Sequence, residues 1–178
     1  MPAYHSKQST DGVEEACSCA LLPIKSDIRG QAPVYNNDGG DGDDIIDEVL
    51  TYFRANVLFR NFDVKNGADR TLIYLTLYAC QCLVKCEKID DKPTALRELK
   101  ELSRKQFAIP GDANWPLGNL YPQPSNRSES DTFRAYFKQT REELCIRLVE
   151  RLFDQDGTKN KWWQSFSKRK FMGKELKD

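Results

Sequence analysis

A run of fourteen residues without a charge, residues 71–84, constrains the fold of this chain more than any other feature. Its strongly polar members, Thr71, Thr76 and Gln81, lie five apart, so on a helix they point in different directions and form no polar stripe. A helix that is apolar all round must be surrounded by protein, since a membrane span would need about 20 apolar residues. We therefore predict a central hydrophobic helix from Ala68 to Lys88 that the rest of the chain encloses.

A strand is the alternative for part of this run, because residues 72–78 include β-branched and aromatic side chains. The run is longer than an ordinary strand, however, and Asn66 with Asp69 resembles an N-cap followed by an acid in the first helical turn. Lys85 and Lys88 also suit the negative end of a helix dipole. These signals favour the helix.

Four further segments have apolar residues at the three- and four-residue spacing of a helix that buries one face. They are residues 44–58, 94–107, 131–153 and, as a terminal helix or helical turn, 158–172. No segment carries a convincing strand pattern. The sequence therefore predicts an all-α fold of about five helices, with residues 44–178 as a single all-helical domain.

The first 43 residues show no helical period, and Pro23 and Pro33 disfavour a helix. One apolar patch, residues 20–24, interrupts this polar stretch, and residues 36–44 are polar and rich in glycine. We expect residues 1–43 to form an extended N-terminal arm followed by a flexible linker. Whether the arm docks through its apolar patch or stays free is open at this point.

Residues 109–125 form a long segment with no predicted secondary structure, in which four prolines and two glycines separate large apolar side chains. A loop of this length inside a domain is uncommon unless it is packed or functional. Two interpretations stand. The loop can cover the core as a strap, with the Trp115 side chain buried in it. Alternatively, the loop can present Trp115, Leu117 and Tyr121 to a partner.

The charge composition is balanced, with 27 basic and 27 acidic residues, so no overall charge points to nucleic acid or to an acidic substrate. The distribution is uneven, because residues 1–48 hold ten acids and three bases, whereas 158–178 hold seven bases and two acids. No secretory signal precedes the six cysteines, and we expect Cys80, Cys82 and Cys86 to be small, reduced core residues in a cytosolic protein.

The residue patterns typical of catalytic sites and metal sites are mostly missing from this sequence or incomplete in it. His5 is the only histidine and lies in the arm, so a catalytic triad would require an improbable fold-back. Cys80 and Cys82 point to different sides of one helix, with no second pair to complete a zinc site. Residues 37–48 match a calcium loop incompletely, because Gly39 stands where an oxygen ligand is required. We predict no enzyme activity, no cofactor and no metal.

One group of residues stays a candidate for function: the basic, aromatic C-terminal stretch, residues 161–172. Its rings and cations could stack bases and neutralise phosphates, which is typical of single-stranded nucleic-acid binding. Trp162 and the cations Lys168 and Arg169 could equally anchor a protein interface. At helical spacing, Trp163 could also belong to the core. All three interpretations are open from the residues alone.

Several blocks along the chain together resemble one protein family. They are Met1-Pro-Ala-Tyr-His-Ser6, Ala20-Leu-Leu-Pro-Ile-Lys-Ser26, Ala68-Asp-Arg-Thr-Leu-Ile-Tyr-Leu-Thr-Leu-Tyr78, Ile109-Pro-Gly111 with Pro116-Leu117, and Lys161-Trp-Trp163 with Phe166, Lys168-Arg169, Phe171 and Met172. In this order they resemble subunit 3 of the actin-related protein 2/3 complex, the assembly that nucleates branched actin filaments. The sequence departs from the pattern of this family in residues 36–43, 88–102 and 123–130.

The resemblance implies an all-α, non-catalytic structural subunit that packs against actin-related protein 3 and meets the actin filament through the complex. It implies a cytoplasmic location at the actin cytoskeleton and in cell projections, with no bound nucleic acid and no membrane span. The alternative is a single-stranded nucleic-acid-binding module that uses the C-terminus. We take the interface candidates from residue type and expected exposure. They are Trp115, Leu117, Tyr121, Trp162, Trp163, Lys168, Arg169 and Lys170.

Overall fold

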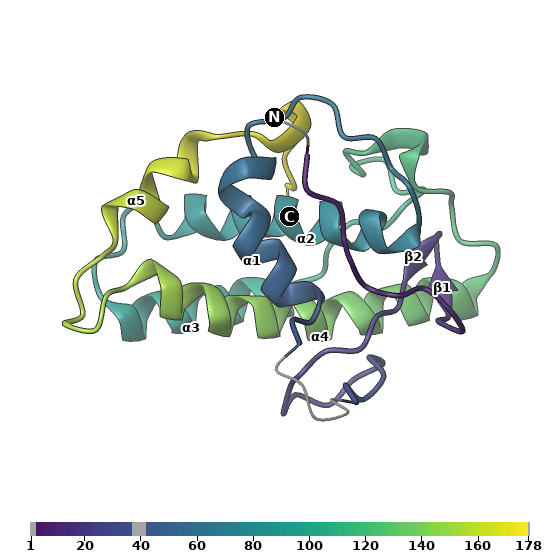
Figure 1. The fold of residues 1–178 in the computed structure, drawn as a ribbon, viewed down its shortest axis with the longest axis horizontal. Coiled ribbons are helices and arrows are strands. Elements are labelled where there is room, and N and C mark those ends of the chain that lie inside the picture. The colour runs from purple at the N-terminus through teal and green to yellow at the C-terminus, as the bar shows by residue number, and fades with distance from the viewer. Residues whose placement is uncertain (1–2, 37–41, 178) are drawn as a thin grey trace.

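The computed structural model describes residues 3–36 and 42–177, which contain five α-helices and a small two-stranded sheet (Figure 1). The helices are α1 (Ile45–Asn56), α2 (Gly67–Lys85), α3 (Lys92–Arg104), α4 (Arg127–Leu152) and α5 (Lys161–Gln164). The strands are β1 (Glu15–Ala16) and β2 (Cys19–Ala20), and the short 3-10 turns are η1 (Gly118–Leu120), η2 (Ser165–Lys168) and η3 (Phe171–Gly173). Helices α2, α3 and α4 run along the long axis, and α1 crosses them.

Helix α2 begins where the side chain of Asn66 accepts a hydrogen bond from the backbone N–H of Asp69 at 3.1 Å. Fifteen of its nineteen residues are buried, and α1, α3, α4, β2 and the two C-terminal turns all contact it. It ends three residues before the predicted Lys88. The Lys159 ammonium binds the carbonyl oxygens of Cys86 and Glu87 there, so the chain turns instead of adding helical hydrogen bonds.

The prediction that the chain has no strand is wrong for the N-terminal region. Strands β1 and β2 pair antiparallel, with Glu15 opposite Ala20, around a turn in which Cys17 and Ser18 have φ of 50° and 60°. The hairpin lies against the start of α2, where a Cβ on Gly67 would approach the Ser18 carbonyl oxygen to 2.9 Å. Only glycine allows this close approach without a shift of the backbone.

The N-terminal region contributes to the same hydrophobic cluster as the helices. Leu21, Leu22 and Ile24 are at most 4% exposed, and the Tyr136 hydroxyl on α4 donates to the Leu22 carbonyl at 2.8 Å. The predicted linker, 36–44, lies partly outside the described residues, which resume at 42. Asp44 then caps α1 by accepting a hydrogen bond from the Asp47 backbone N–H.

The arm before the hairpin folds back on α1 and α2, contrary to the expectation for His5. The His5 imidazole Nδ1 lies 2.7 Å from the buried Asp69 carboxylate, and its ring packs on Phe62. The backbone N–H of Ser6 donates to Asp69, and that of Lys7 donates to the buried Glu48. Two buried carboxylates therefore hold the arm by its backbone.

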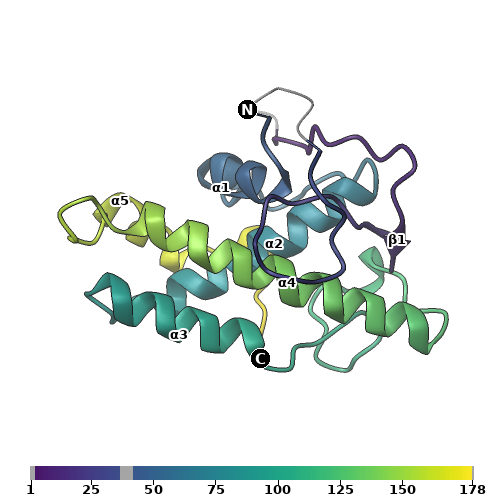
Figure 2. The ribbon, with the colours of Figure 1, turned by 90° about the horizontal axis from the view of Figure 1, so that it is seen from below.

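Helices α3 and α4 lie side by side in both views (Figure 2), and α4 also contacts the start of α1, where Arg147 binds the Asp44 carboxylate at 2.7 Å. Each begins earlier than predicted because a side chain outside the apolar pattern caps it: Asp91 accepts from Thr94, and Asn126 accepts from Glu129. Pro93 lies in the first turn of α3. Proline is tolerated there because its missing N–H would have no helical partner.

Candidate partner interface

The C-terminal segment, defined here as residues 159–177, lies across α1 and the second half of α2. Phe53 of α1 stacks on Trp163 with ring centroids 5.7 Å apart, and the edge of Phe166 meets Phe53 at 6.1 Å. Further along, the backbone N–H of Met172 donates to the Phe59 carbonyl at 3.2 Å. The segment is therefore fixed to the helical core at several points and does not trail from it.

The two adjacent tryptophans of this segment have opposite environments. Trp163 is 4% exposed, whereas Trp162 is 59% exposed. The Arg54 guanidinium of α1 lies 5.4 Å from the ring centroid of each, so one cation contacts both indoles. A guanidinium over an indole is a favourable cation–π contact, and it holds the exposed Trp162 ring in place.

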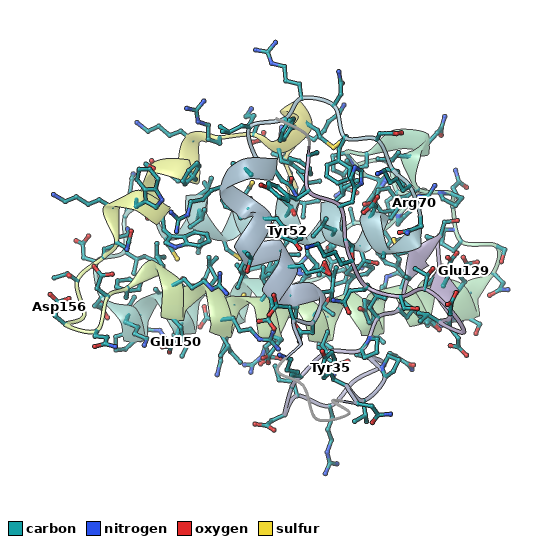
Figure 3. All side chains as sticks on the ribbon, in the orientation of Figure 1. Tyr35, Tyr52, Arg70, Glu129, Glu150 and Asp156 are labelled. Atoms are coloured by element: carbon teal, nitrogen blue, oxygen red, sulfur yellow. The ribbon has the colours of Figure 1, made fainter. Side chains whose placement is uncertain are left out.

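A second aromatic contact at the surface joins the arm to the half-buried Tyr52 of α1. Tyr4 of the arm is 47% exposed and stacks on Tyr52 with centroids 5.2 Å apart, and Leu58, 55% exposed, follows Arg54 by one helical turn. Figure 3 labels Tyr52 on α1. Residues two apart on a helix point in nearly opposite directions, so Tyr52 with Tyr4 lies on one flank of α1 and Arg54 with Trp162 on the other, while Leu58 follows the end of the helix. We call these five side chains, which frame the outer side of α1, the α1 ridge.

The cations of the C-terminal segment line a different feature, a groove beside α2. Lys168, Arg169 and Lys170 are exposed, and they rim a hollow of about 200 Å³ whose floor includes Leu77 and Val84 of α2. Val84 is 54% exposed, which makes it one of the few large apolar side chains in contact with solvent in the described chain. We call this feature the basic groove.

The remaining candidates lie in the loop of residues 109–125, and the structure buries them. Trp115, Leu117 and Tyr121 are 8%, 6% and 1% exposed. The Trp115 ring stacks on Tyr74 of α2 at 5.9 Å, and the Tyr121 hydroxyl donates to the Arg70 carbonyl. In this structure the loop is a strap over the first half of α2.

Sequence reasoning missed Tyr4, Tyr52, Arg54 and Leu58 as surface candidates. Tyr52, Arg54 and Leu58 fall outside the apolar stripe of α1, which marks them as outward-facing, but the stripe alone cannot show that rings from the arm and the C-terminus stack on them. That contact depends on segments about 50 and 100 residues away in the chain.

The thiols and acids of the described residues form no reactive or metal-binding group. All six cysteines are free and buried, and burial raises the pKa of Cys80 to about 12 and that of Cys86 to about 11, so both stay protonated at neutral pH. No three histidine, cysteine, aspartate or glutamate side chains of residues 3–36 and 42–177 are placed to hold a metal ion. In the same residues, no helix is long and apolar enough to cross a membrane.

Comparison with known proteins identifies the family. A family model described as P21-Arc, the ARPC3 (21 kDa) subunit of the ARP2/3 complex, matches residues 1–176. Proteins named actin-related protein 2/3 complex subunit 3 from Dictyostelium discoideum, Arabidopsis thaliana and Schizosaccharomyces pombe are 44%, 43% and 42% identical to this chain. The matches cover 97%, 95% and 99% of this chain and 99%, 96% and 100% of those proteins. The chain belongs to this family.

The subunit 3 family is non-catalytic and structural. Several blocks that carry the sequence resemblance are packed inside this chain: His5 and Asp69 bind each other, Leu22 accepts from Tyr136, and Trp163 stacks on α1. The α1 ridge and the basic groove are two of the described surfaces where large apolar side chains and cations face solvent together.

Proposed function

We propose that this chain is a structural subunit of an actin-related protein 2/3 complex, in which it packs against actin-related protein 3 and supports nucleation and branching of actin filaments. The observation that carries the proposal is the match to subunit 3 over nearly the whole length of both proteins. The chain would therefore work in the cytoplasm, at the actin cytoskeleton and in cell projections.

The physical task of such a subunit is to hold other proteins in a fixed geometry. Fixing the relative positions of two actin-like subunits costs several kcal/mol of translational and rotational entropy, on the order of 4–15 kcal/mol. A rigid accessory subunit offsets part of this cost through the contact area it supplies. The arm, pinned at Asp69 and Glu48, and the C-terminal segment, pinned at Phe53 and Phe59, give this chain the required stiffness.

The α1 ridge is the surface that we assign to actin-related protein 3. Tryptophan, tyrosine and arginine dominate the binding energy of protein interfaces, and the ridge presents all three. Its side chains are already ordered in the isolated chain, because Tyr4 stacks on Tyr52 and Arg54 holds Trp162. Little side-chain entropy would then be lost on binding.

A nucleic-acid module is less well supported by the same geometry. Base stacking needs exposed ring faces, and in the C-terminal stretch Trp163 and Phe171 are buried. The remaining tryptophan, Trp162, already has the Arg54 guanidinium against its ring. The ridge therefore suits a protein partner better than a flexible single strand.

The test is co-purification of the tagged chain with the other subunits, expressed together, with and without the pair Trp162→Ala and Arg54→Ala. We expect this variant to retain about thirtyfold less actin-related protein 3, the loss produced by removing roughly 2 kcal/mol at an interface hot spot, and to form fewer branches under the microscope. Val34→Ala is the control, because Val34 is 82% exposed and pairs with Ile24 of the N-terminal region, outside the ridge. Wild-type retention and branching by the double variant would refute the ridge assignment.

A further inference from the structure

The basic groove lies between the second half of α2 and the end of the C-terminal segment, apart from the α1 ridge. Leu77, Cys80 and Val84 of α2, with the amide side chain of Gln81 among them, form its floor, and Leu176 closes the other side. Lys168, Arg169, Lys170 and Lys174 surround these apolar groups, with Glu175 as the acid among the lining residues.

Three of the four cations that line the groove have no ion-pair partner within the described chain. Glu175 pairs with Lys170 at 3.7 Å and with Lys177 at 3.5 Å. Among residues 3–36 and 42–177, no carboxylate lies within ion-pair distance of Lys168, Arg169 or Lys174. Three positive charges are therefore available to a partner.

The size and the floor of the groove indicate what kind of group it takes. At about 200 Å³, the hollow is smaller than the roughly 300–1,000 Å³ of small-molecule sites, so it suits one or two protein side chains. Its floor is mainly apolar, with the Gln81 amide among Leu77, Cys80 and Val84, and Val84, 54% exposed, gains from being covered by an apolar group. Aromatic rings, which a nucleic-acid base would need for stacking, are missing from the described lining residues.

We propose that the basic groove receives an acidic segment of a neighbouring protein, with an apolar side chain over Val84 and carboxylates against Lys168, Arg169 and Lys174. The inference rests on the proposed function, since the partner is taken to be another subunit of the complex. The groove then adds a second, charge-selective contact to the one at the α1 ridge. Complementary charge around an apolar centre fixes orientation and selects the partner.

The experiment uses the complex purified with this chain and compares two charge-reversal variants. The groove variant carries Lys168→Glu, Arg169→Glu and Lys174→Glu. The control variant carries Lys105→Glu, Arg134→Glu and Lys138→Glu, three cations that line a separate groove between α3 and α4. We expect the complex to retain at least about tenfold less of the groove variant than of the wild-type chain, and to retain the control variant nearly as well as wild type. Retention of the wild-type chain should also fall as the ionic strength rises.

A zero-length carbodiimide cross-linker, which joins lysine amines to carboxylates in direct contact, identifies the partner segment. We expect Lys168 and Lys174 of the assembled complex to be joined to aspartate or glutamate of another subunit. A second variant, Val84→Lys, tests the apolar floor without reversing the rim, and we expect it to lower retention too. Circular dichroism of each free variant checks that its helices are intact.

The outcomes separate this inference from the proposed function. A wild-type chain that retains no actin-related protein overturns both. The groove proposal alone is overturned if the wild-type chain enters the complex and the groove and Val84 variants enter it equally well. In that case Lys168 and Lys174 would also cross-link only within this chain. Salt-sensitive binding of a single-stranded oligothymidine that the groove variant loses would also overturn it, in favour of nucleic acid.

Discussion

The loop of residues 109–125 and the C-terminal segment both cover α2, and both are rich in aromatic residues, yet they use their rings differently. The loop covers the first half of α2 and places Trp115 and Tyr121 in the core. The C-terminal segment covers the second half, where it buries Trp163 and leaves Trp162 59% exposed. The loop therefore only covers the core, whereas the C-terminal segment covers the core and also exposes an aromatic ring to solvent.

The difference follows from where the charges lie. Between residues 109 and 125, Asp112 is the single charged side chain, and its carboxylate accepts the Ile109 backbone N–H, so the whole segment can pack inward. Residues 159–177 hold seven lysines and arginines, whose burial without partners would be prohibitive. Cations interleaved with rings therefore force one face of the C-terminal segment into solvent, and some rings stay out with them.

The largest effect that distinguishes the regions should come from Trp115→Ala. Its ring packs against Tyr74, Tyr121 and Phe133, and we expect truncation to lower the free energy of unfolding by about 3–5 kcal/mol, measured by urea denaturation. Trp115→Phe is the matched control. Among the described residues, the buried Trp115 indole N–H has no hydrogen-bond partner, so phenylalanine loses ring area but also removes an unsatisfied donor. Equal, small losses for both variants would mean that the loop is not part of the core.

The next comparison is between the adjacent tryptophans of the C-terminal segment. Trp163→Ala should lower the free energy of unfolding by about 3 kcal/mol, because its ring is buried on Phe53. Trp162→Ala should lower it by about 1 kcal/mol or less, the value of an exposed cation–π contact with Arg54. Thermal melting of both variants gives the ranking, and a reversed ranking would show that the two environments are assigned wrongly.

The helices themselves were predictable from local patterns. The cap predicted at Asn66 and the helical spacing of apolar residues in 44–58 and 131–153 agree with the structure, in which Phe133, Phe137 and Leu148 are among the buried residues of α4. Each depends on residues within a few positions of one another, which is the range over which capping and periodicity act. The all-α, five-helix expectation therefore holds apart from the short hairpin.

Features that depend on distant residues were not predictable in this way. Arginine usually lies on the solvent-facing side of an amphipathic helix, yet Arg141 of α4 is fully buried, with its guanidinium 4.2 Å from the Tyr78 ring centroid and 4.3 Å from that of Phe107. Its position, four residues after Phe137 on the same stripe, was the available signal. Whether the aromatic residues of the 109–125 loop are buried, and which residues bind the N-terminal arm, also depends on contacts between segments far apart in the chain.

The smallest expected effect concerns how the end of the loop is held. The Glu129 carboxylate in the first turn of α4 accepts hydrogen bonds from the backbone N–H and hydroxyl of Ser125 and from the Cys17 backbone N–H, and these lower its pKa below the ordinary 4.5. A depressed pKa means that the contribution to stability is present above pH 4.5 and is lost as the pH falls through the folded-state value. The C-terminal segment is instead held by rings and backbone contacts.

Glu129→Gln tests this anchor, because glutamine keeps the shape and removes the charge. We expect the variant to be less stable than wild type by about 1 kcal/mol or less at neutral pH, since the site is largely exposed, and the gap to close in acid below pH 4.5. Urea denaturation of both proteins across that pH range measures the gap. If the stability difference between the two proteins stayed constant with pH, the shape of the Glu129 side chain, and not its charge, would hold the end of the loop to the hairpin. The loop and the C-terminal segment would then both be held against α2 by uncharged contacts.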